Sequence, residues 1–196
     1  MFSEDKLPKL ILLEGLPKYE NVNEAYAIAD ALEIMKKSCD GRRARHLKII
    51  PHTAENKADF MRWLEKDTDF LHISAHGYRV NNQTILKITR NGTLTPKEIA
   101  ELNIKAKVIF MNACQQSRKD MAEAFFKAGK PKYRFFIAPF KEVPFDEAFL
   151  IALLFYKNAF LERTSLENSK SLLKALEKVY TMRIKTQYFF WEWPYL

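Results

Sequence analysis

The sequence predicts a mixed α/β fold, in which helices cover both faces of a mostly parallel central sheet of about six strands. Short apolar runs alternate with segments of helical periodicity along almost all of the 196 residues. The apolar runs are continuous, which is typical of strands that are buried on both faces. The composition, 47% hydrophobic and 29% charged, is that of a globular protein.

The first half of the chain follows this alternation. We expect strands at residues 10–13, 47–50 and 69–75, and helices at residues 23–37 and 54–66. Each strand is an apolar run, and each helix shows apolar positions three and four residues apart. The first strand is expected to end at Gly15, and the second to stop at Pro51, because proline cannot donate a hydrogen bond to a ladder.

The second half begins with an expected hairpin. We expect hairpin strands at residues 85–88 and 93–94, helices at 96–102, 120–128, 144–160 and 166–182, and further strands at 107–111 and 135–138. Asn91-Gly92 suits a tight primed turn between the hairpin strands. Thr95 and Glu98 form a capping-box pattern, with Pro96 at the first helical position.

The aromatic tail at residues 187–196 has two interpretations. It is expected to dock on the core as an edge strand. The alternative is a partner surface, because Trp and Tyr are frequent anchors of interfaces.

Charge and motif content argue against several classes of function. The chain carries a net charge of +8, and its densest basic stretch covers residues 36–48. No aromatic residues suited to base stacking interleave this stretch, so we expect a solvated rim, or the contact surface of an acidic protein partner, rather than nucleic-acid binding. No glycine-rich phosphate loop follows a strand, so no nucleotide cofactor is expected. His72 and His76 are four residues apart on a strand, about 13 Å, which is too far for one metal ion.

Cellular location is predicted from the amino terminus and the cysteines. The first six residues are too charged for a signal peptide, and no apolar run approaches the roughly 20 residues of a membrane helix. Cys39 and Cys114 do not make a disulfide framework. We therefore expect a single domain over residues 1–196, in the cytoplasm, with reduced thiols and no membrane contact.

Two short phrases carry the candidate chemistry. Ser74-Ala75-His76-Gly77 and Asn112-Ala113-Cys114 each follow an apolar strand. The carboxyl ends of neighbouring parallel strands, about 4.8 Å apart, open onto one crevice. A thiol with an imidazole in reach is the minimal set for nucleophilic catalysis.

Cys114 could instead be an inert buried thiol, as many free cysteines are. Its position after the strand, ahead of a helix expected near Arg118, favours the catalytic interpretation. His76 is expected to be accessible and His72 to lie in the core, while Cys39 is expected to fill space at a helix end.

Longer phrases around these residues resemble a known family. The runs "FLHISAHG", "GTLTPKEIAEL" and "KVIFMNACQQS", in this order, are similar to the caspase-like CHAT domain of the caspase–separase–gingipain group of cysteine peptidases. The resemblance extends from about residue 8 to the end of the chain. Caspases proper carry Gln-Ala-Cys-x-Gly, whereas this chain has Asn112-Ala113-Cys114-Gln115-Gln116, so caspase-type specificity is not implied.

The resemblance implies a caspase-like α/β/α sandwich and a cysteine endopeptidase. Its catalytic dyad would be His76 and Cys114, its oxyanion hole the backbone N–H groups of Gly77 and Cys114, and Asn112 would line the specificity pocket. The substrate would be a protein or peptide. A separate regulatory protein, and a role in bacterial defence or regulated cell death, would fit the family. The competing hypotheses are an idle fold that serves as an interaction module and an unrelated role.

Overall fold

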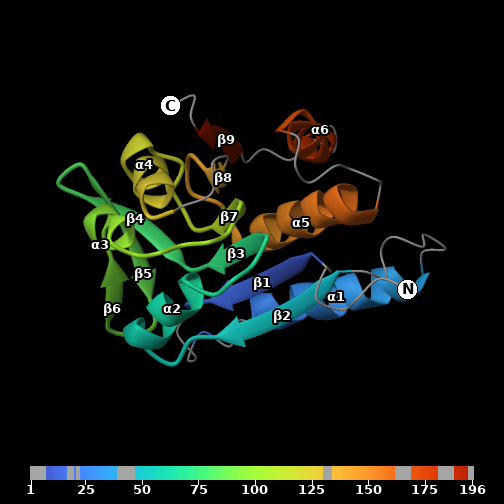
Figure 1. Cartoon of the computed structure of the whole chain (residues 1–196), viewed down its shortest axis with the longest axis horizontal. Coiled ribbons are helices and arrows are strands. Elements are labelled where there is room, and N and C mark those ends of the chain that lie inside the picture. The colour runs from blue at the N-terminus through green and yellow to red at the C-terminus, as the bar shows by residue number, and fades with distance from the viewer. Residues whose placement is uncertain are drawn as a thin grey trace.

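The structure of the protein is a computed structural model (Figure 1). It describes residues 8–16, 20, 23–38, 47–129, 134–161, 169–180 and 188–193. Cys39 and most of the basic stretch, residues 39–46, lie outside the described residues, so the predictions for them stay untested.

The central sheet has six strands in the order β2-β1-β3-β7-β8-β9. Its strands are β1 (Lys9–Glu14), β2 (Lys48–Thr53), β3 (Phe70–Ser74), β7 (Val108–Asn112), β8 (Arg134–Pro139) and β9 (Tyr188–Trp193). The first five are parallel, and β9 pairs antiparallel with β8 at one edge. The predicted α/β sandwich with a mostly parallel sheet is confirmed, and the aromatic tail docks as an edge strand.

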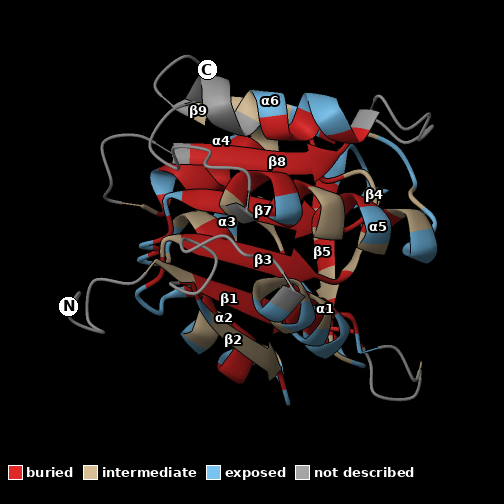
Figure 2. Cartoon of the chain, turned by 90° about the vertical axis from the view of Figure 1, so that its right-hand side faces the viewer, coloured by how far each residue is buried: buried red, intermediate tan, exposed pale blue. Residues whose placement is uncertain are grey.

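Two layers of helices enclose this sheet (Figure 1). One face packs against α1 (Glu24–Ser38), α5 (Phe145–Tyr156), the π-helical segment η4 (Lys157–Leu161) and α6 (Ser169–Tyr180). The other face packs against α2 (Lys57–Leu64), α3 (Pro96–Ala100) and α4 (Lys119–Lys127). Along β3, Phe70 packs in the hydrophobic core under α1 and α5, while Leu71 and Ile73 pack in the core on the opposite face of the sheet. Figure 2 shows β1, β3, β7 and β8 buried between the two layers.

Two expectations at turns and strand ends are wrong. Pro51 does not stop the second strand, because β2 continues through it to Thr53. β2 pairs only with β1, so it is an edge strand, where a missing N–H is tolerated on the open side. The predicted primed turn at Asn91-Gly92 is also absent, because the positive φ in that connection, 56°, belongs to Thr89.

A separate three-stranded antiparallel sheet follows β3. It consists of β4 (His76–Val80), β5 (Gln83–Ile88) and β6 (Gly92–Leu94). The predicted hairpin corresponds to β5 and β6, whereas β4 was not expected. Asn81 and Asn82, with φ of 49° and 63°, form the two-residue turn between β4 and β5. Both are residue types that tolerate this left-handed conformation, as a primed turn requires.

The predicted capping box of the short α3 helix is confirmed. The Thr95 side chain accepts from the Glu98 N–H, and the Glu98 carboxylate accepts from the Thr95 N–H. Within the described ranges, none of the helices combines the length and the apolar character that a bilayer crossing requires.

Candidate active site

The two segments predicted to carry the chemistry meet at the carboxyl edge of the sheet. Ser74 and Asn112, the last residues of β3 and β7, are paired in register. His76 is the first residue of β4, and Cys114 lies two residues beyond β7. The short links after the two strands therefore run side by side, and the Ala75 N–H donates to the Asn112 carbonyl at 3.2 Å.

Gly77 lies directly against the Cys114 backbone. A Cβ atom at Gly77 would be 2.0 Å from the Cys114 carbonyl oxygen and 2.5 Å from the Gln116 Nε2. Because the first of these neighbours is backbone, a side chain at this position would push the two segments apart. Glycine at this position allows the histidine strand and the cysteine loop to touch.

The Cys114 thiol is partly buried and free. Its Sγ lies 3.5 Å from the Val143 N–H that donates to it and 3.7 Å from the Val143 carbonyl that accepts from it. The next residue, Gln115, has a φ of 59°, and its N–H donates to the Lys141 carbonyl at 3.1 Å. A non-glycine residue in this conformation is a local strain of the kind that collects at functional sites. The loop after β8 thus holds the thiol in place.

Gln116 connects the cysteine loop to the small sheet. Its side chain is fully buried, and its Nε2 donates to the Cys114 carbonyl at 3.1 Å and to the Ile85 carbonyl at 3.2 Å. This side chain therefore fixes the position of the cysteine relative to β5, which pairs with the histidine strand.

The His76 imidazole projects into a half-exposed position, as expected. Its side chain is 45% exposed, and its Nε2 lies 2.8 and 2.9 Å from the two carboxylate oxygens of Glu20. A carboxylate at Nε2 favours the tautomer with the proton on that nitrogen, which leaves Nδ1 for proton transfer. Among the described residues no hydrogen bond joins this imidazole to the Cys114 thiol; such bonds often form only once substrate is bound.

Within the described residues, two backbone N–H groups at Cys114 and Gly77 are available to a substrate. The Cys114 N–H donates to none of the described residues. Between the antiparallel strands β4 and β5, residue pairs that exchange backbone hydrogen bonds alternate with pairs that do not. The alternation starts at the tight turn with the hydrogen-bonded pair of Val80 and Gln83. This alternation makes Gly77 opposite Leu86 an unbonded pair, so β5 does not use the Gly77 N–H.

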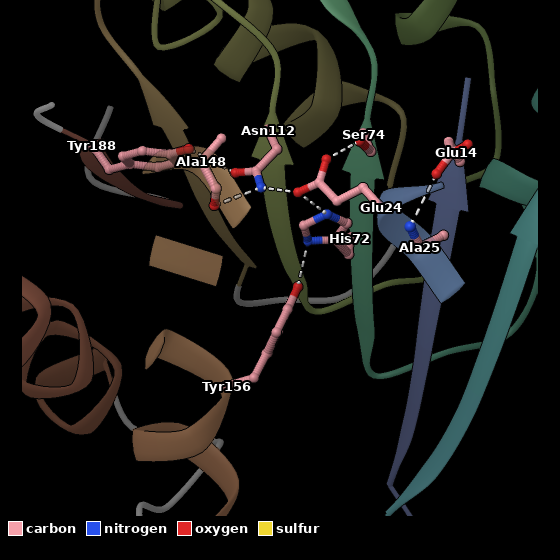
Figure 3. Close-up of polar contacts among 9 residues, drawn as sticks. All are labelled: Glu14, Glu24, Ala25, His72, Ser74, Asn112, Ala148, Tyr156 and Tyr188. Atoms are coloured by element: carbon pink, nitrogen blue, oxygen red, sulfur yellow. Dashed lines mark hydrogen bonds and ion pairs between the residues drawn. The ribbon is translucent and has the colours of Figure 1, made fainter. Parts of the chain in front are cut away.

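The Asn112 side chain lies among Glu24, Ala148 and Tyr188 (Figure 3). It is 5% exposed and lies in a buried polar network beneath α1 and α5. Its Nδ2 donates to Glu24 Oε1 at 2.5 Å and to the Ala148 carbonyl at 2.9 Å, and its Oδ1 accepts from the Tyr188 hydroxyl at 2.6 Å. Contact with a substrate would require these bonds to be exchanged, so the role predicted for Asn112 in a specificity pocket stays a prediction.

Glu24, at the start of α1, is the centre of this network (Figure 3). Besides Asn112, it accepts from the Ser74 hydroxyl and lies 3.6 Å from His72 Nε2. The His72 Nδ1 is 3.0 Å from the Tyr156 hydroxyl. Burial, and then the Glu24 charge, hold the pKa of Tyr156 well above its usual range. His72 is a core histidine, as expected.

A second carboxylate lies beside the network. Glu14 ends β1 in register with Ser74, is 2% exposed, and accepts from the Ala25 N–H at 3.0 Å. Burial, with a smaller contribution from the nearby Glu24 charge, raises the pKa of Glu14 to about 7, although the hydrogen bond from Ala25 acts to lower this pKa.

The sequence analysis did not identify three of these contributors: Glu20, Glu24 and Gln116. Glu20 lies in a connection without periodicity, so no pattern could indicate it. The buried network did have a signal, because Glu14, Ser74 and Asn112 are polar residues at the last position of strands that are mostly apolar. In the part of the chain that the structure describes, no group of three or more His, Cys, Asp or Glu side chains could hold a metal ion.

Similarity to known proteins identifies the family and the fold of the chain. Residues 11–133, more than half of the chain, match the sequence model of the CHAT domain. The chain belongs to the CHAT-domain family. Its fold is similar to the crystal structure of the Drosophila initiator caspase Dronc, with a TM-score of 0.52 and 11% sequence identity over 92% of this chain and 78% of that chain. No curated protein sequence matches. This CHAT domain therefore has a caspase-like protease fold.

Proposed function

We propose that this CHAT domain is a cysteine endopeptidase, with Cys114 as the nucleophile and His76 as the general base and acid. The observation that carries the proposal is the contact between Gly77 and the Cys114 backbone, which brings the histidine strand and the cysteine loop together. The thiol is free, and the imidazole has a carboxylate partner in Glu20. The thiol and the imidazole are the minimal set for thiol catalysis, and Glu20 adds a group that orients the base.

The first half of the reaction forms an acyl-enzyme. The Cys114 thiol gives its proton to His76, and its sulfur bonds to the carbonyl carbon of the scissile peptide. The negative charge moves to the carbonyl oxygen, which the Gly77 and Cys114 N–H groups stabilise. The imidazolium, held by Glu20, then donates the proton to the departing nitrogen as the C–N bond breaks.

The second half restores the enzyme. Water gives a proton to His76 and its oxygen bonds to the thioester carbon. The carbon–sulfur bond breaks, the new carboxyl end leaves, and the imidazolium returns the proton to sulfur.

The regulatory part of the proposal rests on the relative position of the His76 and Cys114 side chains. Because no hydrogen bond joins the described imidazole and thiol, the site needs an event that closes it. Binding of an activating protein in trans, or of the substrate itself, would supply that event. A cytoplasmic location belongs to the same proposal, because reducing conditions keep Cys114 available.

The competing function is that of an interaction module with an idle dyad. The observation that favours it is the contact of His76 Nε2 with Glu20 rather than with the thiol. An active enzyme keeps its biological effect only with Cys114 intact, whereas an interaction module keeps it after Cys114→Ala.

Cleavage of a quenched fluorescent casein tests the proposed function, with the native host lysate added as a source of activator. Wild type is expected to cleave, Cys114→Ala to give only background, and His76→Ala to lose about 10²–10⁴-fold. Cys39→Ala is the matched control and is expected to retain full activity. Equal rates for wild type and Cys114→Ala would contradict the proposal.

A further inference from the structure

A groove of about 540 Å³ opens on the small sheet beside the catalytic histidine. It is lined by His76 and Tyr78 of β4, Lys87 of β5, Arg90 and Asn91 of the β5–β6 connection, and Gly92 and Thr93 of β6. We call it the β4–β5 groove. Because the His76 imidazole is part of its wall, a molecule bound in this groove contacts the group that handles the proton.

The sheet register explains how these side chains come to share one surface. His76 lies opposite Lys87, and Lys87 lies opposite Thr93, so the three form a row across the three strands. Side chains directly opposite in an antiparallel pair project from the same face, about 5 Å apart at Cβ. Leu86 and Leu94, one position along, are buried on the other face. The groove is therefore fixed by strand pairing.

The charge of the groove is positive. Lys87 and Arg90 make no ion pair with any residue that the structure describes, and Arg90 is exposed. The one described carboxylate paired with a lining residue belongs to Glu20, which is bound to His76 Nε2. Two cations without an ion-pair partner among the described residues thus line one groove, where a carboxylate could contact both.

We propose that the β4–β5 groove binds the part of a peptide substrate that departs with the new amine, and that it selects Asp or Glu side chains there. This inference rests on the proposed function. The general acid must reach the departing nitrogen, so the chain that continues from this nitrogen runs beside the imidazole. Along that path Lys87 and Arg90 attract carboxylates and repel basic side chains, while Tyr78 offers a flat surface for the peptide.

Sequencing of new amino termini in an amine-blocked, proteome-derived peptide library tests the selectivity. Wild type is expected to enrich Asp and Glu about three- to tenfold within the three positions after the cut, the range given by one or two partly exposed ion pairs. Lys87→Gln/Arg90→Gln should remove the enrichment, and Lys87→Glu/Arg90→Glu should replace it with Lys and Arg. The matched control, Lys127→Glu/Lys174→Glu, makes the same charge change on exposed lysines of α4 and α6 and should leave the selectivity unchanged.

A binding measurement separates this proposal from the proposed function. Acetyl-Glu-Glu-Glu-amide is titrated into Cys114→Ala, and the backbone resonances of Arg90 and Thr93 are followed by NMR. Saturable shifts support acidic-peptide binding in the β4–β5 groove even if the library is not cut. These shifts should be absent with the control peptide acetyl-Gln-Gln-Gln-amide, and absent when Lys87→Gln/Arg90→Gln is added to Cys114→Ala. Cleavage without acidic enrichment overturns the groove and leaves the peptidase intact. No binding and no cleavage contradict both.

Discussion

The carboxyl edge of the sheet contains two polar regions that use similar residues in opposite ways. Under α1 and α5, Glu24, Ser74 and Asn112 are at most 5% exposed, and hydrogen bonds join their side chains. Just beyond the same strands, His76 is 45% exposed, and the Cys114 thiol has, among the described residues, only the main chain of Val143 as a hydrogen-bond partner. The buried region thus fixes the strand ends, whereas the side chains of the open region remain available to hydrogen-bond a substrate.

The largest expected effect tests the structural role of the buried region. Asn112→Ala removes three hydrogen bonds, one of them to the buried Glu24 carboxylate. We expect the free energy of unfolding to fall by about 3–5 kcal/mol, because a buried charge loses a partner. Urea unfolding followed by circular dichroism measures it.

Ser117→Ala is the matched comparison. It removes one neutral hydrogen bond, from Trp191 Nε1 to Ser117 Oγ at 2.9 Å. A loss of about 1 kcal/mol is expected there. If Asn112→Ala were no more destabilising than Ser117→Ala, the network would not be a stabilising centre.

The next effect concerns pH. The pKa of Glu14 is raised from 4.5 to about 7 in the folded state, so the folded protein binds a proton more tightly than the unfolded chain. The stability from this proton is fully present below pH 4.5 and is lost as the pH rises through 7, by about 3 kcal/mol in total. Glu14→Gln should remove this dependence and be the more stable protein at pH 8.

Unfolding in urea at pH values from 4.5 to 8 checks the Glu14 prediction. The exposed Glu123→Gln variant is the control and should follow wild type at every pH. Parallel curves for wild type and Glu14→Gln would show that Glu14 ionises normally.

The smallest effect on stability tests the open region. Glu20→Gln replaces the carboxylate beside His76 with a neutral acceptor, so we expect the free energy of unfolding to change by less than about 0.5 kcal/mol. The kcat for cleavage should fall, by less than the about 10²–10⁴-fold expected for His76→Ala, while KM changes little. Glu123→Gln, an exposed carboxylate on α4, should retain both constants. An unchanged kcat in Glu20→Gln would remove Glu20 from the mechanism.

Local patterns predicted most of the fold. Continuous apolar runs identified the buried parallel strands, and Thr95 with Glu98 identified the start of α3. The wrong predictions concern a strand end and a turn, where residues that are distant in the sequence but close in space determine the backbone conformation. Pro51 is tolerated because β2 lies at an edge, and Thr89 takes the left-handed conformation instead of Gly92.

The candidate site was predictable only in part, for the same reason. His76 and Cys114 each follow a recognisable strand, so the sequence could place both residues at the carboxyl edge of the sheet. The partners of Glu24 are 50 and 88 residues away, and Glu20 is 56 residues from His76. No local pattern encodes such contacts, because they depend on how α1 and its leading loop pack over the finished sheet.

The most direct measurement of the central claim is intact-mass spectrometry after incubation with a broad acyloxymethyl-ketone peptide probe, with and without native host lysate. Wild type and Cys39→Ala are expected to gain one adduct located at Cys114. Cys114→Ala should gain none, and His76→Ala should react far more slowly. An adduct that persists in Cys114→Ala, or no adduct on wild type even with lysate, would contradict the claim that Cys114 is an activated nucleophile.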